Sequence, residues 1–349
     1  MGKSPSANAT FTFPLQNTPK ICIHYPEGVQ FLSGPDRIDR AGELLADGSL
    51  VIIPTETVYG LAADAENPDA VARIFTTKNR PTDHPLIVHI SSADSLDYWG
   101  VNIPNYARDL AATYWPGPMT LVVQRSDKAK DFITGNQNTV ALRVPGHETT
   151  RHIIDALAKA KSKQYAGVAA PSANRFGKVS PTSLDHAVRE LGDYLQESDA
   201  ALDGGQCDVG IESTIIDCTG PNPVILRSGA ITESDVMQIA TLSEFESTVR
   251  APGMLASHYA PTATVRIIDS IDQVNEENEA FLALAEFETP NNCSRLASPG
   301  NATEYAQVLY SALRQADDLG CSTVFVIAPQ GPGIAAAVRD RLARAAHGE

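Results

Sequence analysis

Two cationic side chains stand close together in a part of the chain that is stiffened by proline. Lys78 and Arg80 are two residues apart, and Pro81 and Pro85 follow them. In an extended loop the side chains of residues i and i+2 point to the same side, so both cations can face one anion. Taken alone, the pair would be interpreted more simply as part of a solvated loop.

More cations and hydrogen-bonding groups stand where short apolar runs end. Arg143 lies in such a run, and an arginine there needs a carboxylate partner from the protein or from a ligand. Ser172, Asn174 and Ser180 precede a helix start, where hydroxyl, amide and free backbone N–H groups bind anions. Each can also be a helix cap, and for Thr182 that is the better interpretation. The set is completed by Glu212-Ser213-Thr214 and Arg227-Ser228-Gly229.

Together these residues predict a site for ligands that carry phosphate and carboxylate groups, such as a nucleotide with a small acid. The sequence contains no GxSxG elbow, no HExxH pair, no P-loop and no GxGxxG turn after a strand. No cysteine, serine–histidine pair or lysine is placed as a nucleophile. We therefore expect catalysis by positioning, charge neutralisation and a metal ion rather than by a covalent intermediate.

Alternating strand and helix signals position these residues. Short apolar runs rich in β-branched residues indicate strands at 50–53, 86–90, 119–123, 140–144, 167–170, 213–216 and 224–226. Helical periods lie near 104–114, 149–160, 182–192 and 233–240. Another helix opens at Asn67-Pro68-Asp69, with Asn as cap and Pro at the first position. The pattern predicts an α/β fold on a mixed sheet.

The chain divides into four parts. Residues 1–30, with Pro14, Pro19 and Pro26, are predicted to form an extended N-terminal arm, and residues 31–250 the catalytic domain. Residues 251–263 have neither a helical nor a strand period and are predicted to be a linker that covers the site as a lid. A second, small α/β domain is expected at 264–349, with strands at 264–268 and 324–327 and helices at 304–316 and 334–346.

Composition narrows the class of protein. The 349 residues carry a net charge of −15, which excludes a protein that coats nucleic acid by bulk charge. No apolar run approaches the roughly 18 to 20 residues that span a bilayer, which argues against an integral membrane protein. The five cysteines include no CxxC pair, so a disulfide framework or a thiolate zinc site is not expected. This usage fits a reducing compartment, and we expect the cytoplasm.

Over roughly residues 30–349, the sequence resembles a known family. It is similar to the YrdC-type threonylcarbamoyl-AMP synthases in their long, two-domain form. Any one motif is weak, but their shared order along the chain is specific. The motifs, in chain order, are Pro54-Thr-Glu-Thr-Val-Tyr-Gly-Leu61, Lys78-x-Arg-Pro81, Pro85-Leu86, Trp115-Pro-Gly-Pro-Met-Thr-Leu121, Pro171-Ser-Ala-Asn174, Glu212-Ser-Thr214, Leu226-Arg-x-Gly229, Pro252-Gly-Met254, His258-Tyr-Ala-Pro261 and the segment 333–346.

The resemblance implies a fold, a reaction and partners. The fold would be a YrdC-like mixed, twisted sheet with flanking helices, plus a small Rossmann-like α/β domain at the C-terminus. The reaction would convert L-threonine, bicarbonate and ATP to threonylcarbamoyl-AMP and pyrophosphate, the first step of tRNA threonylcarbamoyladenosine (t6A) modification. Mg²⁺ would accompany ATP, and the downstream partners would be the proteins that transfer the threonylcarbamoyl group to tRNA. Neither direct tRNA binding nor a membrane is expected.

The resemblance also implies which residues bind the two larger substrates. L-threonine would be bound by Thr57, His89, Arg143, Ser213 and the backbone of Ala170. Without the resemblance, His89 would be interpreted as a core histidine. ATP would be bound by Lys78, Arg80, His84, Thr139, Ser172, Asn174, Ser180, Arg227 and, from the linker, Tyr259. His84 departs from the family, which usually has Asn at that position.

Two alternatives belong to other functional classes. A YrdC fold can serve as a double-stranded RNA-binding module without turnover, but residues 31–250 carry 19 basic and 29 acidic side chains, which weighs against a broad RNA surface. The second alternative is a carbamoyl-handling enzyme like the hydrogenase-maturation carbamoyltransferases. Those proteins carry acylphosphatase and Cys-rich zinc segments that this chain lacks.

Overall fold

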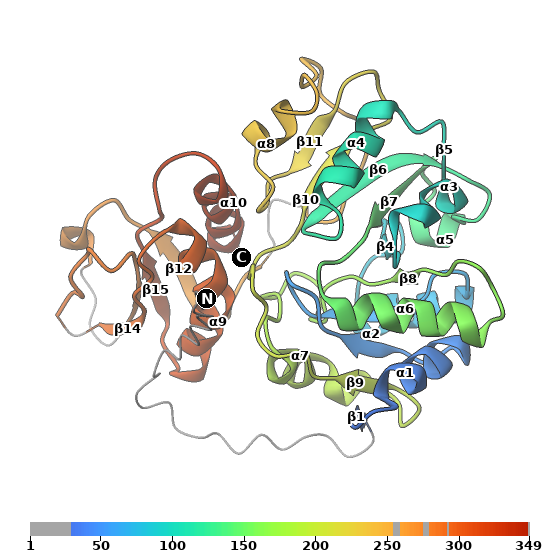
Figure 1. The fold of residues 1–349 in the computed structure, drawn as a ribbon. Coiled ribbons are helices and arrows are strands. Elements are labelled where there is room, and N and C mark those ends of the chain that lie inside the picture. The colour runs from blue at the N-terminus through green and yellow to red at the C-terminus, as the bar shows by residue number, and fades with distance from the viewer. Residues whose placement is uncertain (1–28, 254–258, 275–278, 292, 348–349) are drawn as a thin grey trace, which may run out of the picture.

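The computed structural model describes residues 29–253, 259–274, 279–291 and 293–347, which form two α/β units (Figure 1). The predicted arm at 1–30 lies outside the described residues apart from its last two positions. Residues 254–258 of the predicted linker also lie outside them. None of the described helices is both long and apolar enough to cross a membrane.

A mixed sheet of eleven strands forms the larger unit. The strands run in the order β1-β9-β2-β3-β8-β4-β7-β6-β10-β11, and β5 pairs with β6 off this path. Their bounds are β1 Gln30–Leu32, β2 Val51–Ile53, β3 Gly60–Asp64, β4 Ile87–His89, β5 Gly100–Val101, β6 Met119–Arg125, β7 Thr139–Arg143, β8 Val168–Ala169, β9 Ala200–Leu202, β10 Thr214–Asp217 and β11 Val224–Arg227. The two-residue strand β8 is antiparallel to both β3 and β4, so it joins the two halves of the sheet.

Helices cover both faces of this sheet. Their bounds are α1 Arg37–Ala46, α2 Pro68–Lys78, α3 Leu96–Trp99, α4 Asn105–Tyr114, α5 Asp131–Thr134, α6 Glu148–Ala160, α7 Leu184–Leu191 and α8 Glu233–Met237. The pair α1 and α6 packs on one face, in one apolar cluster with Val51 and Ala62. The helices α2, α4 and α7 contribute to the opposite cluster, with Ile52 and Leu61. Because both faces are buried, these strands are continuous apolar runs, as the sequence predicts.

Helix α2 begins as predicted but ends in a way that changes the site. The Asn67 side chain caps it by accepting from the backbone N–H groups of Asp69 and Ala70, both at 3.1 Å. The helix continues to Lys78, and Asn79 then turns the chain with a left-handed φ of 52°. Lys78 and Arg80 are therefore not in one extended loop, and the expectation that they point to the same side is wrong.

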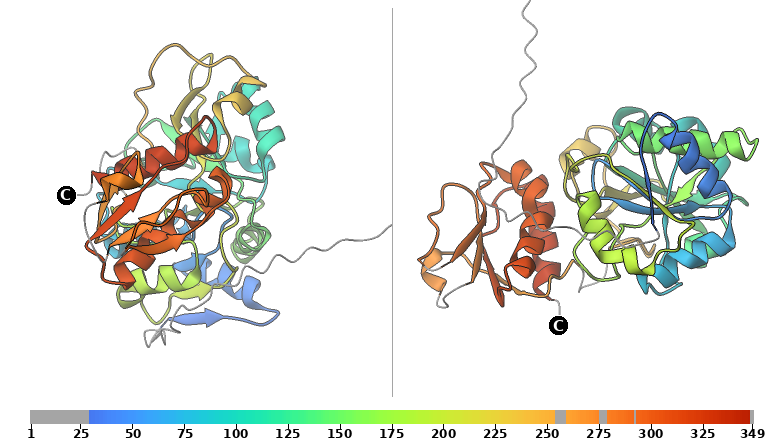
Figure 2. Two further views of the ribbon diagram at one scale, coloured as in Figure 1. Left: turned by 90° about the vertical axis from the view of Figure 1, so that its left-hand side faces the viewer. Right: turned by 90° about the horizontal axis from the view of Figure 1, so that it is seen from below.

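The smaller unit is an all-parallel, four-stranded sheet in the order β12-β15-β13-β14. Its elements are β12 Thr264–Ile267, β13 Ala280–Leu282, β14 Ser294–Ala297, α9 Ala302–Asp318, β15 Thr323–Val326 and α10 Ile334–Ala346. Helices α9 and α10 lie between this sheet and the larger unit (Figures 1 and 2). The predicted small Rossmann-like domain is confirmed, while its division from the catalytic domain at 251–263 stays a prediction.

Candidate active site

One cavity brings together nine of the predicted site residues. It lies between the β2–β3 loop, the strands β4 and β7, the segments after β8 and before β10, the end of β11, and the linker. The predicted residues that line it are Thr57, Arg80, His89, Arg143, Ala170, Ser172, Ser213, Arg227 and Tyr259. Pro252 and Gly253 line it as well, so the linker contributes on both sides of the segment outside the described residues.

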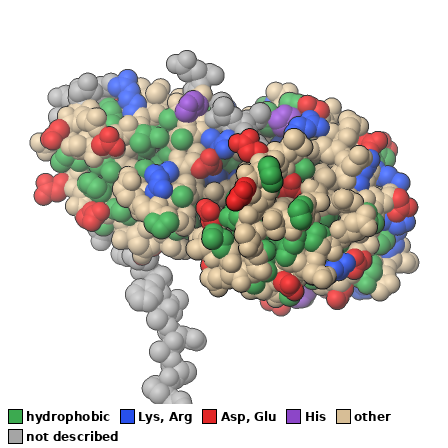
Figure 3. All heavy atoms as spheres, turned by 90° about the horizontal axis from the view of Figure 1, so that it is seen from above, with side chains coloured by type: hydrophobic (Ala, Val, Ile, Leu, Met, Phe, Trp, Pro, Cys, Tyr) green, Lys and Arg blue, Asp and Glu red, His purple; other side chains and the backbone are tan. Residues whose placement is uncertain are grey.

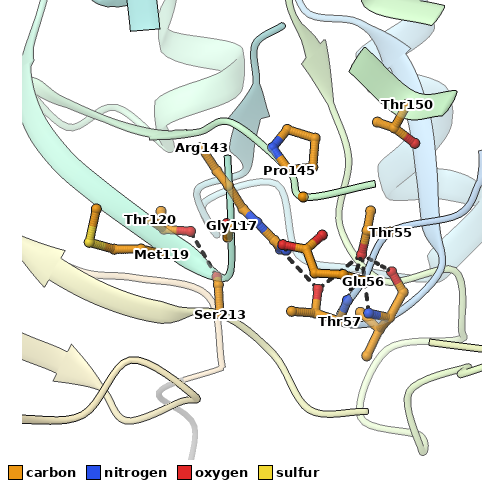
Figure 4. Close-up of polar contacts among 12 residues, drawn as sticks. Thr55, Glu56, Thr57, Gly117, Met119, Thr120, Arg143, Pro145, Thr150 and Ser213 are labelled. Carbon is orange, nitrogen blue, oxygen red and sulfur yellow. Dashed lines mark hydrogen bonds and ion pairs between the residues drawn. The ribbon is translucent and has the colours of Figure 1, made fainter. Parts of the chain in front are cut away.

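At one end of the cavity a buried arginine is held by three partners (Figure 4). The Arg143 guanidinium pairs with the Glu56 carboxylate at 2.6 Å. It also donates to the Thr57 hydroxyl at 2.9 Å and to the Gly117 carbonyl at 3.3 Å. Burial raises the pKa of Glu56, but the charge of Arg143 and hydrogen bonds outweigh burial, so the net pKa is lowered. The pair is therefore ionised, and the guanidinium is fixed in one orientation.

His89 lies beside this arginine as a neutral imidazole. It ends β4, where it is in register with Arg143 of the parallel strand β7. Burial and, after it, the positive charge of Arg143 lower the pKa of His89 to about 3. Its Nδ1 is buried and has no hydrogen-bond partner among the described residues. The uncharged imidazole can therefore form a hydrogen bond with a polar group of a ligand.

Ser213 also lines the cavity, where it hydrogen-bonds with Thr120 and Arg227. Its hydroxyl lies 2.8 Å from the Thr120 hydroxyl. Its backbone carbonyl accepts from the Arg227 guanidinium at 2.9 and 3.1 Å. Arg227 also donates to the Pro252 carbonyl at 3.1 Å, which ties β11 to the linker.

Two arginines of the cavity, Arg80 and Arg227, have no ion-pair partner among the described residues. Arg80 donates to the Pro85 carbonyl at 2.9 Å and lies over the Phe176 ring at 5.5 Å, but its buried Nε has no partner there. Burial lowers the pKa of Arg80 to about 10 and also lowers that of Arg227, so both remain cationic at neutral pH. Burying a charge without an opposite charge is unfavourable. An anionic ligand would remove that cost.

Lys78 and Asn174 support the cavity from behind. The Lys78 ammonium donates to the backbone carbonyls of Ser172, at 2.5 Å, and Asn174. The Asn174 amide in turn donates to the carbonyls of Arg175 and Lys178, both at 2.8 Å. Neither Lys78 nor Asn174 lines the cavity, so they hold the loop on which Ser172 lies.

Ser180 reaches the cavity through an acid that the sequence analysis did not assign. Its hydroxyl donates to the Glu212 carboxylate at 2.6 Å, and Glu212 itself lines the cavity. Glu56 was missed in the same way. Both acids stand in quoted motifs, next to Thr57 and Ser213, and the need of a buried arginine for a carboxylate was the signal that could have found them.

Two predicted ATP contacts lie elsewhere. Thr139 begins β7, at the opposite end of the strand from Arg143, and lines a separate hollow with Arg125 and Thr219. His84 does not line the cavity but packs edge-on against Phe176, with ring centroids 5.3 Å apart. The structure therefore does not bring Thr139 to the other site residues, whereas His84 lies near Arg80, against the same Phe176 ring, but outside the cavity lining.

The described residues contain no group of three or more His, Cys, Asp or Glu side chains that could enclose a metal ion. On the face shown in Figure 3, Lys and Arg are scattered among Asp and Glu and form no continuous basic surface.

Comparisons with known families match nearly the whole described chain. The family model Sua5_yciO_yrdC, described as telomere recombination, matches residues 43–229. The model described as threonylcarbamoyl-AMP synthase, C-terminal domain, matches residues 226–347.

Individual relatives agree with the family models. The chain is 35% identical to a threonylcarbamoyl-AMP synthase of Pyrococcus abyssi over 88% of this chain and 94% of that one. It is 34% identical to a threonylcarbamoyl-AMP synthase of Bacillus subtilis, over 89% and 93%. The crystal structure of P. abyssi Sua5 complexed with L-threonine has a TM-score of 0.79 at 33% identity, and covers 91% of this chain and 97% of that one.

Proposed function

Because the chain belongs to the threonylcarbamoyl-AMP synthase family, we propose that the cavity described above is where it makes threonylcarbamoyl-AMP. The chain is a nucleotidyltransferase of the first step of tRNA threonylcarbamoyladenosine modification. The fold predicted from the sequence is confirmed by the P. abyssi structure. The substrates assigned here are L-threonine, bicarbonate and ATP.

L-threonine occupies the end of the cavity around Arg143 in this proposal. The guanidinium binds the substrate carboxylate with the N–H groups that Glu56, Thr57 and Gly117 leave unused. The hydroxyls of Thr57 and Ser213 and the neutral imidazole of His89 are the groups that can pair with the substrate hydroxyl and amine. The backbone at Ala170 completes this end.

ATP occupies the other end, and one observation carries this assignment: Arg80 and Arg227 are buried cations that line the cavity without an ion-pair partner among the described residues. The triphosphate supplies the missing negative charge. Ser172 and Tyr259 line the same region, while Lys78, Asn174 and Ser180 act from behind it. Direct contacts of Thr139 and His84 with ATP are not part of the proposal.

The proposed reaction has two steps. The threonine amine, as the free base, attacks carbon dioxide or bicarbonate, which forms an N–C bond and releases a proton or water. A carbamate oxygen then attacks the α-phosphorus of ATP, and the bond to the bridging oxygen of pyrophosphate breaks. Arg80 and Arg227 stabilise the negative charge on the phosphates, and Arg143 holds the threonine so that its carbamate faces the α-phosphate.

Mg²⁺ fits this site as part of the nucleotide. No described cluster of His, Cys, Asp and Glu could enclose the ion, and Mg²⁺ is commonly held by substrate phosphates with few protein ligands. When bound, it would neutralise phosphate charge alongside the two arginines.

The partners and the compartment are inferred from the product. Threonylcarbamoyl-AMP is a labile mixed anhydride, so proteins that transfer its acyl group to tRNA must act downstream. We place the protein in the cytoplasm, which fits its cysteine usage. The comparisons support the enzyme and not the RNA-binding alternative.

Pyrophosphate release from ATP tests the proposed function. We expect release to require both L-threonine and bicarbonate, and an adduct of the mass of threonylcarbamoyl-AMP to accumulate in equal amount. Release that is independent of threonine would contradict the assignment. Salt-dependent retention of double-stranded RNA without turnover would favour the alternative instead.

A further inference from the structure

An acid of the larger unit is held by two residues of the smaller one. The Glu212 carboxylate lines the cavity and accepts from the Tyr310 hydroxyl of α9 at 2.8 Å and from Arg341 Nε of α10 at 2.9 Å. Its third partner, Ser180, belongs to the larger unit. The two units therefore meet on the wall of the proposed active site.

Arg341 lies directly behind that wall. Its side chain is completely buried, and it does not line the cavity. It also donates to the Ser228 carbonyl at 2.9 Å, and its guanidinium lies 5.3 Å from the ring centre of Tyr259. The Tyr259 ring is 5.6 Å from that of Tyr310. Glu212 of the larger unit, Tyr259 of the linker and Asp340 of α10, at 2.5 Å, thus surround the same guanidinium, and Asp340 also pairs with Arg344.

A carboxylate in the wall of this cavity would weaken the binding of a triphosphate. Glu212 is next to Ser213, and Arg227 contacts Ser213 from the nucleotide end. Burial raises the pKa of Glu212, but the charges of Arg341 and Arg227 outweigh burial and lower it to about 2. Glu212 is therefore negative at neutral pH, and it would repel phosphate unless a cation compensates it.

We propose that Arg341 of the smaller unit is a positioning residue for the reaction: it neutralises Glu212 and holds it in the wall, so that Arg227 stays available to the nucleotide. The inference rests on the proposed function for the identity of the nucleotide. It gives the smaller unit a role in ATP binding that does not require any of its side chains to enter the cavity. Removing Arg341 would turn Arg227 into the counter-ion of Glu212.

The proposal is tested by comparing how substitutions at Arg341 and at Glu212 change the affinity for the nucleotide. The dissociation constant of a non-hydrolysable ATP analogue with Mg²⁺ is measured by calorimetry on the full chain. Arg341→Met should raise it at least about tenfold, the effect of one lost charge-assisted contact. Glu212→Gln should leave it unchanged or lower it. The double variant should return to within about threefold of the wild type.

Three matched variants separate charge from packing. Arg341→Lys keeps the charge and should bind the analogue within about threefold of the wild type. Tyr310→Phe removes a hydrogen bond to Glu212 without changing charge and should also stay within that range. Arg189→Met breaks a different ion pair between the units, with Asp318 at 3.0 Å, and should leave analogue binding unchanged.

Two results would overturn the proposal. One is a Glu212→Gln variant that weakens analogue binding as much as Arg341→Met, with no recovery in the double variant, because packing alone then explains both. The other is an Arg341→Met variant that binds the analogue as the wild type does. If Arg341→Met does not fold, Glu212→Gln still tests the proposal, because weaker analogue binding by that variant contradicts it. Failure of threonine-dependent pyrophosphate release would instead count against the proposed function, since analogue binding is measured without turnover.

Discussion

The two ends of the cavity differ in whether a carboxylate of the protein neutralises the buried arginines. At the threonine end, Arg143 has Glu56 as a built-in counter-ion at 2.6 Å. At the nucleotide end, Arg80 and Arg227 contact only neutral acceptors among the described residues. The first end is charge-balanced before any substrate arrives, and the second is balanced only when an anion binds.

The difference corresponds to two roles of buried arginines. A paired arginine contributes to folding and presents a fixed geometry to a substrate of small charge, such as an amino acid. An arginine without an opposite charge adds little to folding and keeps its attraction for a highly charged ligand. Mutations at the two ends should therefore affect different measurements.

The largest effect is expected at Arg143. Arg143→Met leaves the Glu56 carboxylate buried without its cation, which should lower the free energy of unfolding by about 3 to 5 kcal/mol. Denaturant unfolding measures it. The double variant Glu56→Gln/Arg143→Met should recover most of the stability but not the use of threonine. A single variant as stable as the wild type would show that the pair does not stabilise the fold.

Selection of the amino acid tests the geometry of the same end. L-valine has nearly the shape of L-threonine but lacks the hydroxyl that the polar groups of Thr57, Ser213 and His89 are proposed to bind. A site built to pair a substrate hydroxyl rejects such an analogue, so kcat/KM for valine should be at least about 100-fold lower. Pyrophosphate release with each amino acid measures the ratio, with L-serine as a control that keeps the hydroxyl. Equal values for valine and threonine would mean that the pocket is misassigned.

At Arg80 we expect a loss of turnover with little change in stability, the reverse of the effect on stability expected at Arg143. Arg80→Ala removes a charge-assisted contact of about 1.5 to 3 kcal/mol, so turnover should fall roughly 10- to 100-fold. Because no carboxylate of the described residues forms an ion pair with Arg80, the free energy of unfolding should change by no more than about 1 kcal/mol. Both assays on one preparation check this. Normal turnover together with strong destabilisation would reverse the comparison.

The smallest effect is expected at His84. Burial and the nearby charge of Arg80 lower its pKa, so at pH 7.5 it is as neutral as the Asn usual in the family. His84→Asn should change the KM for ATP by less than about twofold at that pH. As pH falls through the lowered pKa, His84 gains a positive charge, so tighter ATP binding by the wild type should appear only on the acidic side of the ordinary histidine pKa of about 6.5. A large difference at pH 7.5 would restore His84 as a direct ATP contact.

Strands buried on both faces were predictable because they are continuous apolar runs, and α2 because its cap is local. The three-residue strands β9 and β13 were missed because, unlike the equally short β2, they contain no β-branched residue. Helix α1 was also missed, although α6, which equally has no side-chain cap, was predicted from its helical period. Runs of β-branched residues therefore carry their signal locally, while the short strands without them that complete the sheets do not.

The site residues also differ in whether their sequence signal is local. Thr57, Arg143 and Ser213 were found because each stands in a local motif. The i and i+2 argument for Lys78 failed because Asn79 reverses the chain, which no apolar pattern reports. Thr139 and Arg143 share a strand, but four residues along a strand separate them by about 13 Å. The contact of Arg341 with Glu212 joins residues 129 positions apart, beyond any local pattern.

The strand β8 has a consequence for how the protein is made. It pairs with β3 and β4, yet it comes roughly 80 residues after β4 in the chain. During synthesis at about 5 to 20 residues per second, the nascent chain carries both strands for on the order of 4 to 16 seconds before their shared neighbour exists. Over that interval the inner borders of β3 and β4 are open sheet edges, which are sites of mispairing. Two residues, Val168 and Ala169, then close the gap, so a slower ribosome upstream of them prolongs the interval in which both edges are open to mispairing.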